Sequence, residues 1–198
     1  MSRQRLIWAI AGILLAAVTV WVHYEVKVNL VQAADPMGGS VEESGNLSVG
    51  EEISDFSSVD LDGADVILSE FQNSEVVVLD FWATWCRPCI YSMPSLEALN
   101  EEFEYRGAQF LAVNVGETPE LVREFVEDTD FTVRVVIDEH EEISDAYGVR
   151  GIPQLVVVGK DGRVAHIEVG YPPFAGLAEQ RENRLRELLD DLIRQGGA

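Results

Sequence analysis

Residues 75–89 read Glu-Val-Val-Val-Leu-Asp-Phe-Trp-Ala-Thr-Trp-Cys-Arg-Pro-Cys and contain the only two cysteines of the chain, Cys86 and Cys89. The near-continuous run of β-branched and aromatic residues up to Trp82 predicts a strand that is buried on both faces. After the cysteines, apolar side chains recur at helical spacing over residues 96–103. The stretch therefore predicts a central strand that leads into a helix, with both cysteines at the junction.

On either side of this stretch, strands and helices alternate along the chain. Pro119 is typical of the first turn of a helix, and the apolar side of that helix is expected to consist of Leu121, Val122, Phe125 and Val126. Gly107 is expected to end the helix that follows the cysteines. This order predicts an α/β domain with a mixed central sheet covered by helices. The expected elements are a hairpin over 56–59 and 65–68, strands over 75–82, 110–115 and 133–137, helices from 119 and over 141–147, a hairpin over 154–158 and 164–169, and a last helix over 177–194.

The N-terminus has the pattern of a membrane segment. Arg3 and Arg5 precede an uncharged apolar run over residues 6–22, which is at the short end of the bilayer-spanning range. The positive-inside bias keeps the arginines in the cytoplasm and places the rest of the chain outside it. A cleaved signal peptide with its site near Ala33 is the alternative. The predicted organisation is a membrane anchor over 1–24, a flexible tether over 25–46 and one domain over 47–198.

The charge of the chain is strongly acidic, with 35 acidic residues against 14 basic ones and a net charge of −21. Nucleic acid is an unsuitable partner, because phosphate binding requires a basic surface. So many carboxylates repel one another unless salt screens them, and a high-salt habitat is one hypothesis. A solvated acidic surface that only keeps the protein soluble is the other.

Four kinds of site could use Cys86 and Cys89. A structural zinc site needs about four ligands, whereas the three histidines are scattered. Covalent haem attachment requires His directly after the second cysteine, where this chain has Ile90. A disulfide across two residues closes too small a loop to constrain the unfolded chain much. Thiol redox chemistry remains, with no metal and no cofactor other than the Cys86–Cys89 pair.

The redox interpretation assigns different roles to the two cysteines. Cys86 is expected near the N-terminus of the helix, where unpaired N–H groups and the helix dipole stabilise a thiolate and lower its pKa. Cys86 is therefore the predicted nucleophile, and Cys89, one turn later, the resolving thiol. Arg87 places a cation beside the thiolate, or else faces solvent with little effect. Pro88 suits the first helical turn, and Pro94 either kinks the helix or precedes its start.

Two motifs resemble those of the thioredoxin superfamily. Residues 80–89, Asp-Phe-Trp-Ala-Thr-Trp-Cys-Arg-Pro-Cys, are similar to the active-site strand and loop, and residues 147–153, Tyr-Gly-Val-Arg-Gly-Ile-Pro, to the cis-proline segment. The extra helix and strand over 118–137, the leading hairpin and the N-terminal anchor resemble the membrane-tethered TlpA/ResA/DsbE-type proteins. The resemblance covers residues 47–195 and implies a thioredoxin fold, with an N-terminal hairpin and an inserted helix–strand unit.

The resemblance also implies roles for residues outside the cysteine pair. It implies a cis peptide before Pro153, with the Ile152 backbone free to pair with an extended substrate strand. Asp80 matches a buried carboxyl that moves the proton of the second cysteine, and burial should raise its pKa. The alternative for Asp80 is a carboxylate satisfied by hydrogen bonds. The usual lysine partner is missing, because its expected position is Ala112. The candidate substrate-binding residues are Trp85, Arg87, Pro88 and Ile152.

Together these features predict a membrane-anchored, extracytoplasmic thiol–disulfide oxidoreductase. The expected substrates are disulfides of envelope proteins such as apocytochrome c, and the expected electron donor is a membrane thiol protein. The same chemistry in reverse would make the protein a disulfide-forming oxidase, because about 30 mV in reduction potential corresponds to only about 1.4 kcal/mol. A Cu(I)-binding or delivery module that uses the two thiolates is a further alternative, and a peroxidase is a weaker one.

Overall fold

The computed structural model describes residues 47–71 and 75–195. The chain divides into two units, residues 1–40 and 41–198, and the fold below is that of the second. The predicted anchor and tether lie outside the described residues. Within the described part, no helix is long and apolar enough to cross a bilayer.

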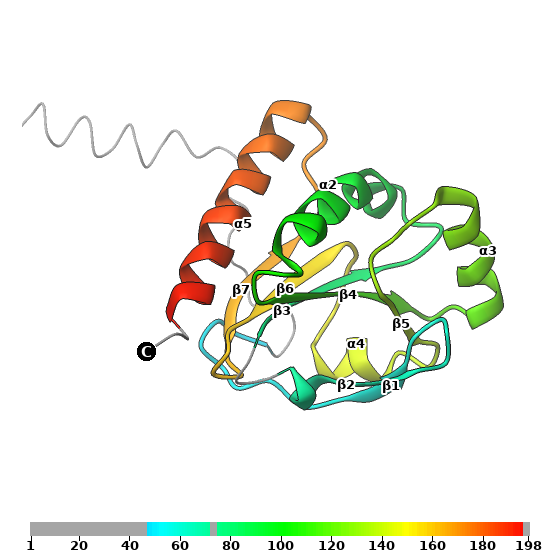
Figure 1. The fold of residues 1–198 in the computed structure, drawn as a ribbon. Coiled ribbons are helices and arrows are strands. Elements are labelled where there is room, and N and C mark those ends of the chain that lie inside the picture. The colour runs from blue at the N-terminus through cyan, green and yellow to red at the C-terminus, as the bar shows by residue number, and fades with distance from the viewer. Residues whose placement is uncertain (1–46, 72–74, 196–198) are drawn as a thin grey trace, which may run out of the picture. The chain divides into compact units, whose positions relative to one another are not determined.

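A five-stranded mixed sheet forms the centre of the domain (Figure 1). The strand order is β5-β4-β3-β6-β7, in which β3, β4 and β5 are parallel and β6 and β7 are antiparallel to their neighbours. All seven residues of β3 are buried, because other strands flank it on both sides and helices or loops cover both faces. The strands are β3 (Val76–Trp82), β4 (Ala108–Val115), β5 (Val135–Asp138), β6 (Gln154–Val158) and β7 (Val164–Val169).

Three helices pack on one face of the sheet, namely α2 (Arg87–Phe103), α3 (Pro119–Thr129) and α5 (Ala175–Gln195). Their apolar sides meet Val76, Val78 and other residues of β3 in one buried cluster that includes both cysteines. The α/β arrangement with helices over a mixed sheet is therefore confirmed.

The opposite face is covered by α4 (Glu142–Ala146) and by a separate two-stranded hairpin (Figure 1). The hairpin consists of β1 (Ser57–Val59) and β2 (Asp65–Ile67), which are antiparallel, and the 3-10 turn η1 (Leu68–Glu70) follows it. The predicted N-terminal hairpin and the predicted inserted helix and strand, α3 and β5, are thus present.

Two local predictions are wrong. Leu121 does not lie on the buried side of α3 but is 47% exposed, because the helix turns Val122 towards the sheet instead. Gly107 does not end α2. The helix ends at Phe103, and Gly107, with φ +105°, lies in the turn that leads into β4. The helix also runs through Pro94 without ending there.

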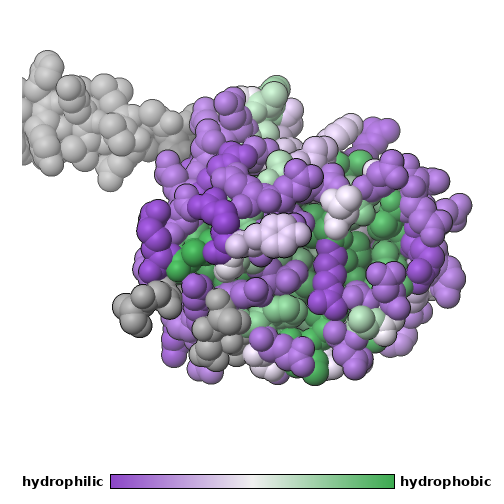
Figure 2. Space-filling view, in the orientation of Figure 1, coloured by the Kyte–Doolittle hydropathy of each residue, from purple (hydrophilic) through white to green (hydrophobic). Residues whose placement is uncertain are grey.

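Hydrophilic side chains cover most of the face seen in Figure 2, with apolar side chains visible between them.

Candidate active site

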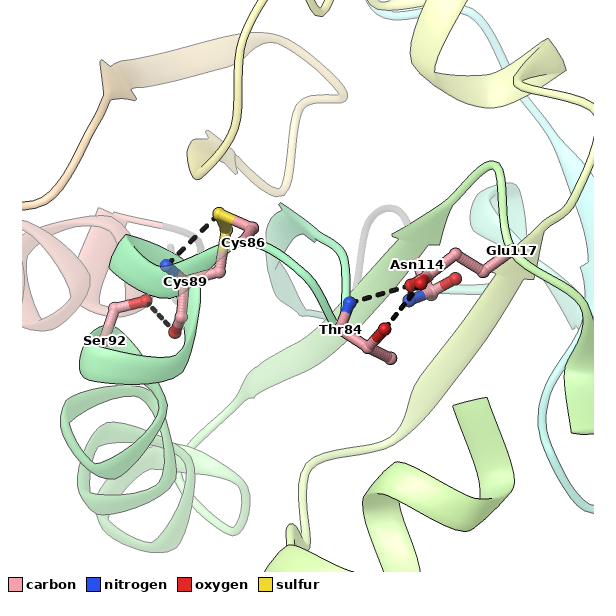
Figure 3. Close-up of a disulfide and its surroundings, with 6 residues drawn as sticks. All are labelled: Thr84, Cys86, Cys89, Ser92, Asn114 and Glu117. Atoms are coloured by element: carbon pink, nitrogen blue, oxygen red, sulfur yellow. Dashed lines mark hydrogen bonds between the residues drawn. A yellow bond between two sulfur atoms is a disulfide. The ribbon is translucent and has the colours of Figure 1, made fainter. Parts of the chain in front are cut away.

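Cys86 is the N-cap residue of α2, and it forms a disulfide with Cys89 (Figure 3). Its backbone is extended, with φ −83° and ψ 96°, and its Sγ accepts a hydrogen bond from the backbone N–H of Cys89 at 3.3 Å. The first N–H groups of a helix have no partner within the helix, so a side chain at the N-cap position is well placed to accept from them. The sequence places Cys86 at this position because β3 ends at Trp82 and Pro88 suits the first helical turn.

Cys89 is more deeply buried than Cys86, as expected for a resolving thiol. Cys86 is 4% exposed and Cys89 is fully buried, so the accessible surface of the pair belongs to Cys86. The backbone carbonyl of Cys89 accepts a hydrogen bond from the Ser92 hydroxyl at 2.8 Å (Figure 3). Cys86 is therefore the more accessible residue of the pair.

Asp80 lies in the middle of β3, opposite Ala112 of β4 and Leu155 of β6. Burial raises the pKa of Asp80 to about 7, while the positive charge of Arg181 acts in the opposite direction and Glu168 adds to the rise. The predicted raised pKa is therefore confirmed, and burial is its main cause. A carboxyl group with a pKa near neutrality can both accept and release a proton at physiological pH.

The peptide between Ile152 and Pro153 is cis, as predicted. Phe81 pairs with Gln154 across β3 and β6, so Pro153 lies at the end of β3 from which the chain continues towards Cys86. The carbonyl of Pro153 accepts a hydrogen bond from the N–H of Gly170 at 2.7 Å. Ile152 is half-buried.

The aromatic residue that precedes Cys86 faces solvent. Trp85 is 71% exposed, and Arg87 and Pro88 are exposed beside it. Trp82 is 1% exposed and packs against Phe125, with ring centroids 5.4 Å apart. The exposed indole is thus available for contact with another molecule, and the buried one stabilises the core.

A buried carboxylate holds the loop before the cysteines in place. The sequence analysis did not predict this residue. Glu117 is 6% exposed and accepts hydrogen bonds from the backbone N–H of Thr84 at 2.8 Å and from its hydroxyl at 2.6 Å. It also accepts from Asn114 Nδ2 at 2.8 Å (Figure 3). The signal was available: Glu117 follows β4, and the carboxyl ends of adjacent parallel strands meet at the same edge of a sheet.

A second missed group consists of Glu168 on β7 and Arg181 on α5. Arg181 is 5% exposed and its Nε lies 2.9 Å from Oε2 of Glu168. Arg181 is four residues before Leu185 and therefore on the apolar stripe of its helix. A charged residue on such a stripe indicates a buried partner.

The described residues contain no group of three or more His, Cys, Asp or Glu side chains that could hold a metal ion. Thr84 and Glu117 hold the loop that precedes Cys86, and Asp80 lies in the strand that leads into this loop.

The thioredoxin-type fold and its disulfide at a helix N-terminus define a thiol–disulfide oxidoreductase. The chain belongs to the AhpC/TSA family, whose model matches residues 49–167, and it is a ResA/DsbE-like member of the thioredoxin superfamily.

Relatives of known name agree with this class. The chain is 36% identical over 124 residues to the thiol-disulfide oxidoreductase ResA of Geobacillus thermodenitrificans, an alignment that covers 63% of this chain and 71% of the relative. It is 32% identical over 140 residues to ResA of Halalkalibacterium halodurans, with coverage of 71% and 76%. Its structure is similar to a putative thiol:disulfide interchange protein DsbE from Chlorobium tepidum, with a TM-score of 0.66, 29% identity, and coverage of 73% of this chain and 99% of the other.

Proposed function

We propose that the protein is a membrane-tethered reductant of disulfides outside the cytoplasm, with Cys86 as nucleophile and Cys89 as resolving thiol. The observation that carries this proposal is the position of Cys86 as N-cap of α2, with the N–H of Cys89 directed at its sulfur. In the reduced protein the same N–H group and the helix dipole favour a thiolate at Cys86.

The reaction begins when the Cys86 thiolate attacks a substrate disulfide. The substrate S–S bond breaks, one substrate sulfur leaves as a thiolate and takes a proton from solvent, and a mixed disulfide joins Cys86 to the substrate. Cys89 then loses its proton to the carboxylate of Asp80 and attacks the sulfur of Cys86. The S–S bond between Cys86 and the substrate breaks, and the second substrate sulfur leaves as a thiolate and takes a proton from solvent, while Asp80 returns its proton to solvent. The Cys86–Cys89 disulfide is then formed, and two electrons have passed to the substrate.

Contacts with the substrate are assigned to the surface around Cys86. Trp85 is 71% exposed and offers a flat apolar face, and Arg87 and Pro88 are exposed next to it. Pro153 directly precedes β6, next to the end of β3 that leads to Cys86. The backbone of Ile152, just before Pro153, is proposed to pair with an extended segment of the substrate. An unfolded or extended protein segment suits such a surface better than a small molecule.

The proposed location and substrate are supported by the first residues of the chain and by the resemblance to the tethered proteins. The apolar run over residues 6–22 after Arg3 and Arg5 supports a single span of the cytoplasmic membrane, with the domain outside. The proposed substrates are envelope proteins with oxidised cysteine pairs, of which apocytochrome c is the specific candidate. A membrane thiol protein would reduce Cys86–Cys89 after each cycle.

Two variants test the roles of the cysteines. Cys89→Ser should accumulate a mixed disulfide between Cys86 and its substrate proteins, because the resolving thiol is missing. Cys86→Ser is the matched control and should trap none. Oxidised apocytochrome c is the probe for the specific substrate, and its reduction by the wild-type protein should be lost in both variants. Trapping by Cys86→Ser but not by Cys89→Ser would contradict the assignment.

The direction of the reaction is tested by the reduction potential of the Cys86–Cys89 couple and by its redox state in cells. A reductant should have a potential nearer that of thioredoxin, about −270 mV, than that of the oxidant DsbA, about −120 mV. It should also be found mainly reduced when thiols are trapped in intact cells. A potential near that of DsbA, together with a mainly oxidised cysteine pair in cells, would show a disulfide-forming oxidase instead.

A further inference from the structure

A buried ion pair lies between β7 and α5, on the same face of the sheet as Asp80. Arg181 Nε donates to Oε2 of Glu168 at 2.9 Å, and the two side chains are only 6% and 23% exposed. The guanidinium of Arg181 also lies over the ring of Tyr171, 5.3 Å from its centroid. His166 Nε2 lies 3.9 Å from the same oxygen of Glu168. The arginine is therefore held in one position by several partners.

The register of the sheet places this pair beside Asp80. Asp80 is directly opposite Leu155, and Leu155 is directly opposite Glu168, so the three side chains form one row across β3, β6 and β7. Residues directly opposite each other in antiparallel strands point to the same face. Glu168 and Asp80 therefore share a face, with an apolar side chain between them.

Among the residues that the structure describes, the neighbouring strands β4 and β6 add no charge at the positions opposite Asp80. β4 contributes Ala112 at the opposite position, and β6 contributes Leu155. The helix α2 contributes Cys86 and Cys89 to the same buried cluster. The ionisable groups described on this side of the sheet include the two cysteines from α2, Glu168 and His166 from β7, Arg181 from α5, and Tyr171 beside Arg181. Of these, Arg181 and Glu168 act on the pKa of Asp80.

The two members of the ion pair act on Asp80 with opposite signs. Arg181 lowers the pKa of Asp80 and Glu168 raises it, on top of the larger rise caused by burial. Although burial also acts on Glu168, its contacts with His166 and Arg181 hold its pKa below the ordinary value, so it remains an anion. A buried cation is the only group among these that favours the ionised form of Asp80.

We infer that Arg181, fixed by Glu168, is a positioning residue for disulfide exchange: it supplies the internal positive charge that supports ionised Asp80 when Asp80 takes the proton of Cys89. This inference rests on the proposed function. It also explains how the site operates with Ala112 in the strand next to Asp80, since the cation comes from the C-terminal helix instead.

The direct test is a titration of the Asp80 carboxyl by carbon NMR in the full-length oxidised protein. Arg181→Gln should raise the titration midpoint by about one pH unit, because an opposite charge nearby has been removed. Glu168→Gln should lower it, because a like charge has been removed. Looser packing alone would not move the midpoint in opposite directions in the two variants.

Two further variants serve as controls. Arg181→Lys retains the positive charge, so the titration midpoint of Asp80 in this variant should lie close to that of the wild type. Arg186→Gln removes an arginine from the same helix, one that pairs with Glu102 and Glu182 at the surface, and should leave the midpoint unchanged. If Arg181→Gln does not fold, Glu168→Gln and Arg181→Lys still decide the question.

The second measurement is the pH dependence of the exchange rate. With the midpoint of Asp80 near 7, a rise of one unit lowers the ionised fraction at pH 7 about fivefold, and the rate of Arg181→Gln should fall to the same extent. In an Asp80→Asn background the Arg181→Gln change should have no further effect on the profile.

The outcomes separate the inference from the proposed function. An Asp80 midpoint that responds to neither substitution overturns the inference, whatever the enzyme does. Midpoints that move while the exchange profile stays constant overturn it as well, because ionised Asp80 is then not the proton acceptor. A wild-type protein without exchange activity contradicts the proposed function, and the NMR midpoints then show separately whether Arg181 acts on Asp80.

Discussion

The backbone N–H of Cys89 donates to Sγ of Cys86 at 3.3 Å, and this bond makes Cys86 the cap of α2. The two cysteines are therefore unequal before any chemistry takes place. Cys86 lies at the positive end of the helix and is 4% exposed, whereas Cys89 is fully buried within the first turn. The spacing of two residues between them is what produces this geometry.

The first prediction concerns the alkylation of the reduced protein. Cys86 should react with iodoacetamide with a midpoint below about 8.5, the ordinary value for a free thiol, and should react before Cys89. Mass spectrometry of digests over a pH series measures both sites, and Cys86→Ser and Cys89→Ser identify each signal. A midpoint of Cys86 at the ordinary value, or faster labelling of Cys89, would contradict the assignment of the nucleophile.

The second prediction concerns Asp80 and the stability of the fold. The pKa of Asp80 is raised from 3.8 to about 7 in the folded protein, so the unfolded chain ionises first as the pH rises. The stabilisation from this group is therefore fully present below about pH 4 and is lost as the pH rises through about 7.

Asp80→Asn should accordingly be as stable as the wild type near pH 4 and more stable at pH 8, by an amount on the order of a few kcal/mol. Chemical denaturation of the oxidised protein at both pH values measures the difference. Asp128→Asn, at an exposed position of α3, is the control and should show no such dependence. Equal stabilities of Asp80→Asn and wild type at pH 8 would refute the prediction.

The third prediction concerns Glu117, which accepts three hydrogen bonds from Thr84 and Asn114. In Glu117→Gln an amide NH₂ group replaces one of the two accepting oxygens. This group cannot accept a hydrogen bond, so at least one donor of Thr84 or Asn114 loses its partner. The free energy of unfolding should fall by about 1.5–3 kcal/mol, the usual contribution of a hydrogen bond to a charged group. The exchange rate should fall too, because Thr84 belongs to the loop that carries Cys86.

Denaturation curves and exchange assays of Glu117→Gln measure both effects. The matched control is Glu124→Gln, which changes an exposed glutamate of the neighbouring helix α3 and should change neither quantity. If Glu117→Gln is as stable as the control variant, the carboxylate does not fix the loop.

The fourth prediction concerns salt. With a net charge of −21, self-repulsion should destabilise the domain at low ionic strength and weaken as salt is added. At about 1 M salt the screening length is about 3 Å, so the free energy of unfolding should rise between low salt and this concentration. Sodium chloride and potassium chloride should act alike if screening is the cause. A constant stability would remove the argument for a high-salt habitat.

Local sequence determined the central strand, the helix after it and the position of Cys86 between them. These features depend on neighbouring residues: β-branched runs form strands, and a cysteine followed by Arg-Pro at a helix start becomes a cap. The two hairpins were predicted in the same way, from their turn residues, whereas the cis peptide before Pro153 was expected only from the resemblance to the thioredoxin superfamily. The raised pKa of Asp80 followed from its position inside an apolar strand.

Only the tertiary structure decided which distant residues act on this site. Glu117 reaches Thr84 across 33 positions of the chain, and Arg181 meets the row of Asp80 from the last helix. The sequence marks both residues, Glu117 by its place after β4 and Arg181 by its place on an apolar stripe. It does not give their partners, because each contact depends on how β4 and α5 pack against β3. Val122, Phe125 and Val126 were predicted correctly on the sheet side of α3, but the exposure of Leu121 was decided by packing for the same reason.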